Sequence, residues 1–316
     1  MAQQANQPLP NGHQLEEYTI DRQLSLGGFS IVYLATDPEG RQVAIKEYLP
    51  NSLALRSKGE INPVITSEHL GAFRYGMKCF FEEGRALARL SHPNVIRVLN
   101  FFRANDTVYM VMEYEHGRTL QEFIQKHQGH ISERFMRGVF TRMLNGLREV
   151  HSNKLLHLDL KPSNIYLRSD NTPVLIDFGA ARQTLISDQP ILKPMYTPGF
   201  ASPEHYGTRK DLGPWSDIYS VGASMYACLS GVAPQAADSR LKKDTLAPAM
   251  VRWEGQYSDR LLEIIDWCLN VNHLYRPQSV FALQKALVET VAPPEEERKP
   301  PTWLNRVVGK LRKPAK

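Results

Sequence analysis

The chain has 316 residues, of which 42% are hydrophobic and 22% charged, a mixture typical of a globular protein with one large domain or two lobes. Its net charge of +5 is only mildly basic, and the basic residues are mostly interspersed with acidic ones, so no nucleic-acid partner is expected. No apolar run approaches the ~18 residues that a membrane-spanning helix needs. These features favour a cytoplasmic protein.

The three cysteines, Cys79, Cys228 and Cys268, are far apart and form no Cys-x-x-Cys pair. This spacing argues against a disulfide framework or a zinc site and indicates buried thiols in a reducing compartment. Residues 1–17 start with a polar run that has neither a basic leader nor an apolar core. They are predicted to form a disordered arm and not a signal peptide.

Residues 18–112 have the pattern of short β-strands with one helix among them. The runs IVYLATD (31–37) and RQVAIKEYL (41–49) flank the turn sequence Asp-Pro-Glu-Gly, which predicts a hairpin. Apolar residues at helical spacing predict a helix over 76–90. Two further strands are predicted at 95–102 and 108–114.

Beyond residue 117 the pattern becomes helical. The change of character places an N-lobe at 18–112, a hinge at 113–117, a C-lobe at 118–291 and a Pro-rich, basic tail at 292–316. Helices are predicted over 119–127, 132–151, 216–230, 258–270 and 278–290.

Several short motifs supply what phosphoryl transfer requires, namely groups that hold a nucleotide, bind Mg²⁺ and orient an acceptor hydroxyl. Each motif alone occurs by chance, but the ordered set does not. In chain order the motifs are LSLGGFSIVY (24–33), VAIK (43–46), HLDLKPSN (157–164), DFG (177–179) and SPE (202–204).

This ordered set resembles a eukaryotic-type (Hanks-type) protein kinase domain over about residues 18–290. Details such as KEYLP after the lysine of VAIK and DFGAARQ are similar to the bacterial Ser/Thr members. The resemblance implies an α+β, bilobal fold with a small β-rich N-lobe that holds one main helix and a larger helical C-lobe. It also implies ATP and Mg²⁺ as cofactors and protein Ser/Thr hydroxyls as acceptors.

The resemblance assigns roles to individual residues. Lys46 resembles the strand lysine that meets the α- and β-phosphates, and Glu83 resembles its helix partner, with Glu82 as the neighbouring alternative.

The catalytic loop is assigned in the same way. Asp159 resembles the base that accepts the hydroxyl proton, and Lys161 resembles the Ser/Thr-specific lysine that contacts the γ-phosphate. Asn164 and Asp177 resemble the Mg²⁺ ligands, and their oxygen donors suit a hard cation.

The glycine-rich loop departs from the family pattern. Ser25 and Ser30 replace its first and third glycines, Gly27 keeps its place and Gly28 is added. Because the loss of glycine restricts how backbone amides fold over phosphates, we expect a modest nucleotide affinity.

Adenine is expected between the lobes. Glu113 belongs to the expected hinge, and Tyr166 is an unusual occupant of the apolar adenine stack, for which simple core packing is the alternative. The full set of nucleotide-binding candidates is Leu24, Gly27, Gly28, Ser30, Val32, Ala44, Lys46, Met112, Glu113, Tyr114, Thr119 and Tyr166.

Residues 177–204 resemble an activation segment that shapes a platform for a peptide. Thr184, Ser187 and Thr197 are its candidate phosphorylation sites, and Thr197 also resembles the threonine that touches the catalytic aspartate and lysine. Glu204 is expected to pair with Arg276, and Asp217 is expected to brace the catalytic loop.

Leu158 stands where most kinases have an arginine before the catalytic aspartate. Leucine has no charge for a segment phosphate to neutralise, so activity is expected without activation-segment phosphorylation. Arg182 matches another family position that can contact such a phosphate, which keeps a weaker switch open.

Two segments lie outside the family pattern. The insertion within 47–75 is predicted to be either a regulatory element or a solvated loop. Residues 302–313 have helical spacing and basic residues, so they are predicted to form an amphipathic helix that docks to an anionic membrane or to the kinase domain, or else a disordered tail.

The leading hypothesis is an ATP- and Mg²⁺-dependent protein Ser/Thr kinase. A pseudokinase-like ATP-binding scaffold is the main alternative, and a small-molecule kinase is the third. The first alternative is disfavoured because Lys46, Asp159, Asn164 and Asp177 are all present.

Overall fold

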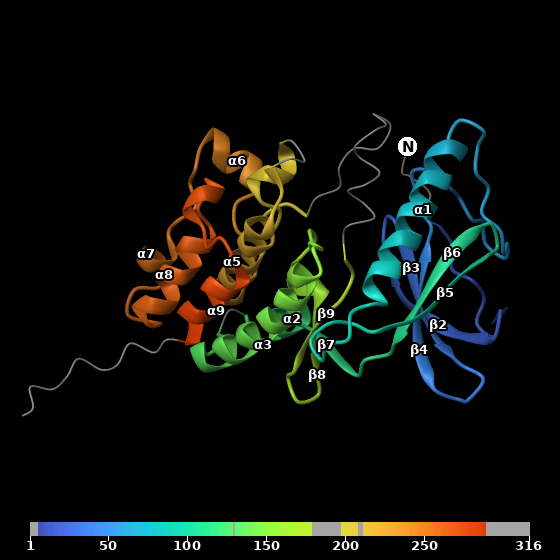
Figure 1. The fold of residues 1–316 in the computed structure, drawn as a ribbon, viewed down its shortest axis with the longest axis horizontal. Helices are drawn as coiled ribbons and strands as arrows, with labels where there is room; N and C mark the ends of the chain where they lie inside the picture. Colours follow the sequence, from blue (N-terminus) through green and yellow to red (C-terminus); the bar gives the residue numbers. More distant parts are fainter. Residues whose placement is uncertain (1–5, 129, 179–196, 208–210, 289–316) are drawn as a thin grey trace, which may run out of the picture.

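The computed structural model describes residues 6–128, 130–178, 197–207 and 211–288. Two lobes are seen side by side, one built around a sheet and one helical (Figure 1). The strands are β1 (Gln14–Leu15), β2 (Tyr18–Leu26), β3 (Ser30–Thr36), β4 (Gln42–Tyr48), β5 (Val98–Ala104), β6 (Thr107–Glu113), β7 (Gly117–Thr119), β8 (Ile165–Arg168) and β9 (Pro173–Leu175). The helices are α1 (Leu70–Leu87), α2 (Leu120–His127), α3 (Glu133–Ser152), α5 (Pro214–Ser230), α6 (Ala237–Lys242), α7 (Ala249–Arg252), α8 (Asp259–Cys268) and α9 (Val280–Val288), with short 3-10 turns η1 (Pro162–Asn164), η2 (Pro203–Tyr206) and η4 (His273–Tyr275).

The N-lobe sheet has the order β1-β2-β3-β4-β6-β5, and its neighbouring strands are antiparallel. The predicted hairpin is present as β3 and β4, and Asp37 closes its turn by accepting hydrogen bonds from the amides of Glu39 and Arg41. In this register Lys46 stands opposite Val32 on one side and Met110 on the other. The sheet thereby holds Lys46 in a fixed position between two strands.

Helix α1 is the main helix of this lobe, and it begins at Leu70, before the predicted start at 76. The earlier start follows from Ala72 and Phe73, which are buried and continue the apolar face of the helix. The Phe73 ring packs against the ring of Tyr48 at a centroid distance of 5.3 Å. The C-terminal part of the predicted insertion is therefore helical.

The predicted disordered arm is wrong for residues 6–17. Asn6, Leu9 and Leu15 are all buried against the N-lobe, and β1 extends the sheet beside β2. Leucines at 9 and 15 supply apolar anchors within a polar segment, and burying each of them contributes about 1.5–3 kcal/mol. The folded part of the N-lobe thus begins well before Tyr18.

The C-lobe is built around α5, most of whose residues are buried. Gly222 permits α8 to approach closely, since a Cβ at this position would lie 2.4 Å from the Cβ of Cys268. Cys79, Cys228 and Cys268 are buried, as predicted, and burial raises the pKa of the last two thiols. Among the described helices, none combines the length and apolar character required to cross a bilayer.

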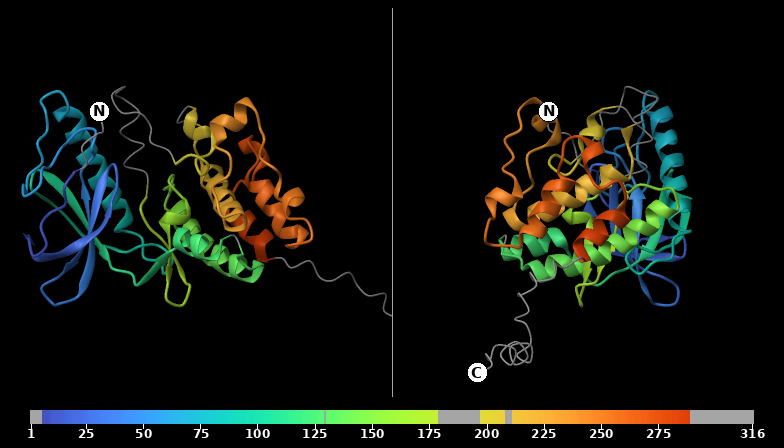
Figure 2. Two further views of the ribbon diagram at one scale, coloured as in Figure 1. Left: turned by 180° about the vertical axis from the view of Figure 1, so that it is seen from behind. Right: turned by 60° about the vertical axis from the view of Figure 1, so that its left-hand side comes forward.

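A small sheet of β7, β8 and β9 lies at the junction of the lobes, as the left view of Figure 2 shows from behind. These strands were not predicted, because each has only three or four residues. Strand β8 follows directly after Asn164, so this sheet carries the catalytic-loop motif to the cleft.

Candidate active site

A cavity of about 550 Å³ lies between the lobes. The two lobes contribute opposite walls, with Ala44 of β4 on one side and Tyr166 of β8 on the other. Of the predicted nucleotide-binding residues, the cavity is lined by Leu24, Val32, Ala44, Lys46, Met112, Glu113, Tyr114, Thr119 and Tyr166.

Two cavity residues have well-defined local environments. Thr119 is the N-cap of α2, where its hydroxyl accepts a hydrogen bond from the amide of Glu122. Burial raises the pKa of the Tyr166 hydroxyl, which is therefore neutral at physiological pH. A cavity wall that is mostly apolar and carries a few hydroxyl groups, here those of Thr119 and Tyr166, is typical of a small-molecule site.

Lys46 reaches across the cavity from the N-lobe to the C-lobe. Its Nζ forms an ion pair with Oδ1 of Asp177 and lies 5.6 Å from the centroid of the Phe80 ring. Glu83 is buried and lines the same cavity, whereas Glu82 is exposed and pairs with Arg85. Glu83 is therefore the glutamate of α1 that faces the site.

The catalytic-loop residues form one hydrogen-bonded cluster. The Nζ of Lys161 lies 3.0 Å from Oδ2 of Asp159 and 2.9 Å from Oγ1 of Thr197. Thr197 in turn donates to Oδ1 of Asp159 at 3.3 Å. The predicted contact of Thr197 with the aspartate and the lysine is thus confirmed.

Asn164 joins this cluster to the metal-ligand candidate Asp177. Its Nδ2 donates to the Asp159 carbonyl at 2.8 Å and to Asp159 Oδ2 at 3.1 Å. With the amide nitrogen directed at Asp159, the Oδ1 of Asn164 and the carboxylate of Asp177 supply oxygen donors of the kind that Mg²⁺ prefers. The donor chemistry of these residues fits the predicted metal.

Residues 18–288 match the family model described as protein kinase domain. The chain belongs to the protein kinase family. Serine/threonine-protein kinase PLK4 of Nematostella vectensis is 30% identical over 244 residues, which are 75% of this chain and 23% of that protein. Serine/threonine-protein kinase ATG1c of Arabidopsis thaliana is 26% identical over 267 residues, 81% of this chain and 33% of that protein. The chain therefore spans about a quarter to a third of the length of these relatives.

Solved structures of kinase domains agree with this membership. The PpkA-294 apo form is 34% identical with a TM-score of 0.79, and the match covers 89% of this chain and 99% of that one. The Mycobacterium tuberculosis PknI kinase domain is 20% identical with a TM-score of 0.65, covering 89% and 98% of the two chains, and shares the fold. The predicted Hanks-type family and bilobal α+β fold are confirmed.

In this kinase domain the HLDLKPSN loop is held by Asp217, as predicted. Its carboxylate accepts from the amide of His157 at 2.9 Å, the amide of Leu158 at 2.8 Å and Nε2 of His151 at 2.7 Å. Burial raises the pKa of Asp217, but these hydrogen bonds and the nearby histidines outweigh it and hold the pKa below its usual value. The Asp217 side chain is therefore a fixed negative charge behind the loop.

The carbonyl side of the same loop is held by His205. Its Nε2 lies 3.2 Å from the Leu158 carbonyl oxygen, and its Nδ1 accepts from the amide of Ser202 at 3.2 Å. Burial lowers the pKa of His205, which favours the neutral ring that this arrangement needs. The SPE motif, one residue of which is Ser202, thus contacts the catalytic loop through the histidine that follows it.

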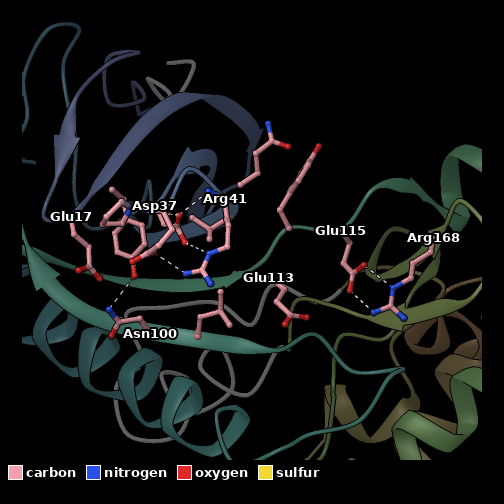
Figure 3. A pocket seen from close by; sticks show the side chains of 14 residues that line it. Glu17, Asp37, Arg41, Asn100, Glu113, Glu115 and Arg168 are labelled. Carbon is pink, nitrogen blue, oxygen red and sulfur yellow. Dashed lines mark hydrogen bonds and ion pairs between the residues drawn. The ribbon is translucent and has the colours of Figure 1, made fainter.

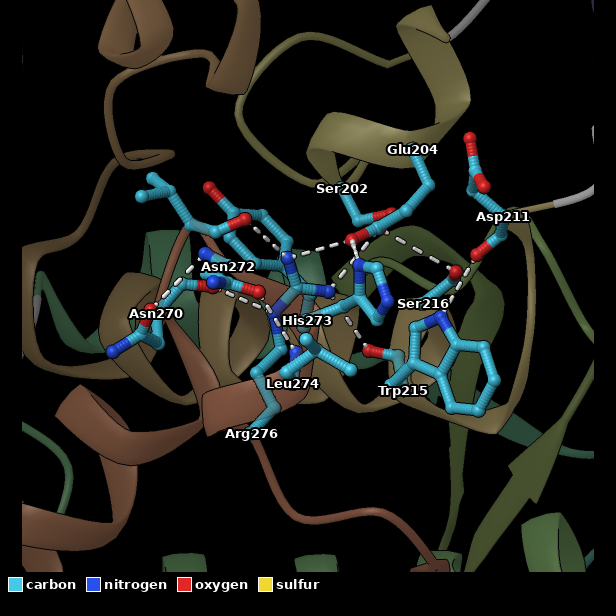
Figure 4. A network of polar contacts seen from close by, with 12 residues as sticks. Ser202, Glu204, Asp211, Trp215, Ser216, Asn270, Asn272, His273, Leu274 and Arg276 are labelled. Carbon is cyan, nitrogen blue, oxygen red and sulfur yellow. Dashed lines mark hydrogen bonds and ion pairs between the residues drawn. The ribbon is translucent and has the colours of Figure 1, made fainter. Parts of the chain in front are cut away.

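Glu204 and Arg276 form the predicted ion pair (Figure 4). The two side chains are almost fully buried and meet at 2.9 and 3.1 Å. Arg276 also donates to the carbonyls of Asn270, Val271 and Trp215. The pair joins η2 at the end of the activation segment to the turn before α9.

Three predicted nucleotide-binding residues lie outside the cavity wall. Gly27 and Gly28 lie in the turn between β2 and β3, and Ser30 is the first residue of β3. The turn closes through a hydrogen bond from Gly27 N to Ser30 O at 2.9 Å. Ser25, which replaces the first glycine, does line the cavity. The turn is held by its own hydrogen bond and by hydrogen bonds to the chain after β4. This placement could not be predicted from the sequence of the loop.

The cavity is also lined by residues to which the sequence analysis assigned no role. Phe178 lines it and stacks on the ring of His157 at a centroid distance of 4.4 Å. Leu87, Ile96 and Ile176 are apolar residues that ordinary core packing would have explained equally well. The DFG motif was the available signal for Phe178.

A second hollow of about 580 Å³ lies on the outer side of the hinge (Figure 3). Its charges are largely paired, with Arg41 against Asp37 and Arg168 against Glu115. The Nε of Arg168 lies 2.7 Å from Oε2 of Glu115 and so ties the hinge to β8. This pair holds the hinge at its outer edge.

Some predicted features lie outside the described residues. These are the activation-segment sites Thr184 and Ser187, the cation Arg182 and the tail at 292–316.

Proposed function

We propose that this kinase domain transfers the γ-phosphate of ATP to Ser/Thr hydroxyls of proteins and requires Mg²⁺. The observation that carries the proposal is the cluster of Asp159, Lys161, Asn164 and Thr197, which adjoins a cavity crossed by the Lys46–Asp177 pair. This cluster combines a carboxylate, a cation and oxygen donors, which are the groups that phosphoryl transfer needs.

Each residue of this site has a separate role in phosphoryl transfer, which follows from its position. Asp159 orients the acceptor hydroxyl and takes its proton, while Lys161 beside it offers a positive charge to the transferred phosphate. Asn164 and Asp177 would hold Mg²⁺, which supplies charge neutralisation at the phosphates when bound. Lys46 would exchange its contact with Asp177 for the α- and β-phosphates, because a phosphate offers the same kind of acceptor.

Asp159→Asn separates binding from chemistry. We expect this variant to lose ~10²-fold or more of the transfer rate, because it lacks a general base, while ATP still binds. The measurement is transfer of labelled phosphate to a generic basic protein, together with nucleotide binding by calorimetry.

A wild-type protein that binds ATP without transfer would support the pseudokinase scaffold instead. If Asp159→Asn kept more than about a tenth of the wild-type rate, the base assignment would be wrong. Substrate peptides with Ser, Thr or Tyr as the sole acceptor test the Ser/Thr preference, which Lys161 favours.

We also propose that the tail binds an anionic membrane surface, which would make a cytoplasmic kinase peripheral to the membrane. The support is the sequence of 302–313, where Trp303 and Leu304 begin an apolar pattern among basic residues. Co-sedimentation with vesicles containing phosphatidylserine is the test, with a 1–292 truncation as control. Equal pelleting of the two proteins would rule out this partner.

A further inference from the structure

The turn of the glycine-rich loop is hydrogen-bonded to the chain that follows β4. The amide of Leu49 donates to the Phe29 carbonyl, and the amide of Asn51 donates to the Gly28 carbonyl, both at 2.9 Å. We call residues 49–56 the loop-holding segment. It belongs to the insertion that distinguishes this chain from the family pattern.

The side chain of Asn6, in the N-terminal segment, hydrogen-bonds to both Leu49 and Asn51. Its Nδ2 lies 2.7 Å from Oδ1 of Asn51, 3.1 Å from the Ala54 carbonyl and 3.3 Å from the Leu49 carbonyl. Its Oδ1 accepts from the amide of Arg56 at 2.6 Å. Both polar atoms of the Asn6 side chain, which is 1% exposed, therefore form hydrogen bonds with the loop-holding segment.

Arg56 anchors the far end of this segment to the sheet. Its guanidinium and the carboxylate of Glu47 are fully buried and meet through two bonds of 2.6 and 2.7 Å. The hydroxyls of Tyr33 and Tyr109 also donate to Glu47, and Arg56 Nε donates to the Gln7 carbonyl. A bidentate pair with this many additional hydrogen bonds has a fixed geometry.

These contacts fix the orientation of the loop's peptide groups. In a trans peptide the carbonyl and the following N–H point in opposite directions. Holding the carbonyls of Gly28 and Phe29 toward residues 51 and 49, respectively, therefore also sets the directions of the amides that follow them, those of residues 29 and 30. Successive backbone amides held in a turn are the groups that bind phosphate oxygens.

We propose that Asn6 and Arg56 are positioning residues for nucleotide binding, which act through the loop-holding segment on the amides of the glycine-rich loop. The tether limits the conformations that this loop samples before a nucleotide arrives, and so lowers the cost of ordering the loop on binding. The inference rests on the proposed binding of ATP. It assigns part of the phosphate affinity to residues 6–9 and 49–56, all outside the cavity wall.

The test compares Asn6→Ala with wild type in the full-length protein. We expect the affinity for Mg²⁺-ADP to fall at least about fivefold, which corresponds to about 1 kcal/mol, while the affinity for adenosine stays unchanged. Calorimetry measures both ligands. Hydrogen exchange at the amides of Leu49 and Asn51, which donate directly to the loop, should become faster.

Asn11→Ala is the matched control, since Asn11 is exposed in the same N-terminal segment and should leave both affinities unchanged. Asn51→Ala is the second variant, because it removes one contact of Asn6 and retains Arg56. If Asn6→Ala shows no cooperative thermal unfolding, the ADP and adenosine affinities of Asn51→Ala test the proposal in its place.

Two results would overturn the proposal. One is an unchanged ADP affinity despite faster exchange at Leu49 and Asn51, which would make the tether merely structural. The other is an equal loss for ADP and adenosine, which would indicate general damage to the cavity. A wild-type protein that binds no ADP would instead overturn the proposed function, and the exchange rates would still decide whether Asn6 holds the loop.

Discussion

Leu158 combines an unusual residue type with an unusual backbone. Its φ of 61° lies in the left-handed region, which is unfavourable for leucine by about 1–2 kcal/mol. The structure holds it there from both sides, through Asp217 at its amide and His205 at its carbonyl. This backbone geometry is supplied by neighbouring side chains without any contribution from a charge at position 158.

We therefore expect kinase activity without activation-segment phosphorylation. Enzyme treated with a phosphatase, which is then removed, should lose less than about tenfold in initial rate, or about 1.4 kcal/mol. Mass spectrometry should confirm that Thr184, Ser187 and Thr197 are unmodified. Leu158→Arg is the companion variant, and it should make the rate more dependent on segment phosphorylation because it adds a partly buried cation beside the catalytic aspartate.

A larger loss that autophosphorylation restores would contradict this expectation. It would mean that another cation, such as Arg182, has taken over the role of the missing arginine.

Sequence motifs identified the charged residues of the site but not the arrangement of its loop. Asp159 and Lys161 could be predicted because phosphoryl transfer requires specific chemical groups at a fixed spacing. The choice between Glu82 and Glu83 needed the structure, because it depends on which face of α1 meets the sheet. The turn at Gly27 and Gly28 could not be placed, since its partners are backbone groups of residues 49 and 51.

At the scale of elements, the long helices were predictable and the short ones were not. Helices α3 and α5 closely match the predicted 132–151 and 216–230, because each has many apolar residues at helical spacing. Helices α6 and α7 have six and four residues, too few for a periodic pattern. They depend on packing against the rest of the C-lobe.

The Glu204–Arg276 pair links η2 to the turn before α9. Arg276→Met should lower the free energy of unfolding by about 3–5 kcal/mol, because it leaves Glu204 buried without its main cation. Arg85→Met is the control, since Arg85 pairs with Glu82 at 3.6 Å on the surface and should cost at most about 1 kcal/mol. Urea unfolding followed by circular dichroism measures both, and equal losses would show that burial of the pair does not matter.

At the scale of the whole molecule, the order of motifs was enough to predict the fold class. The ordered set of motifs predicted two lobes around a cleft. In the structure, motif residues from both lobes line one cavity. The extent of the folded unit was harder to predict. Residues 6–17 are mostly polar, and their order depends on partners such as Arg56 that lie much later in the chain.

The part of the chain that matches the family model and the part that folds therefore have different N-terminal limits in this protein. Family similarity begins at residue 18, yet Leu9 and Leu15 are already part of the hydrophobic core. A fragment that starts at residue 18 would expose the Arg56–Glu47 pair to water and would lack the edge strand β1 of the sheet. Recombinant versions of this domain should therefore retain Asn6 and the residues that follow it.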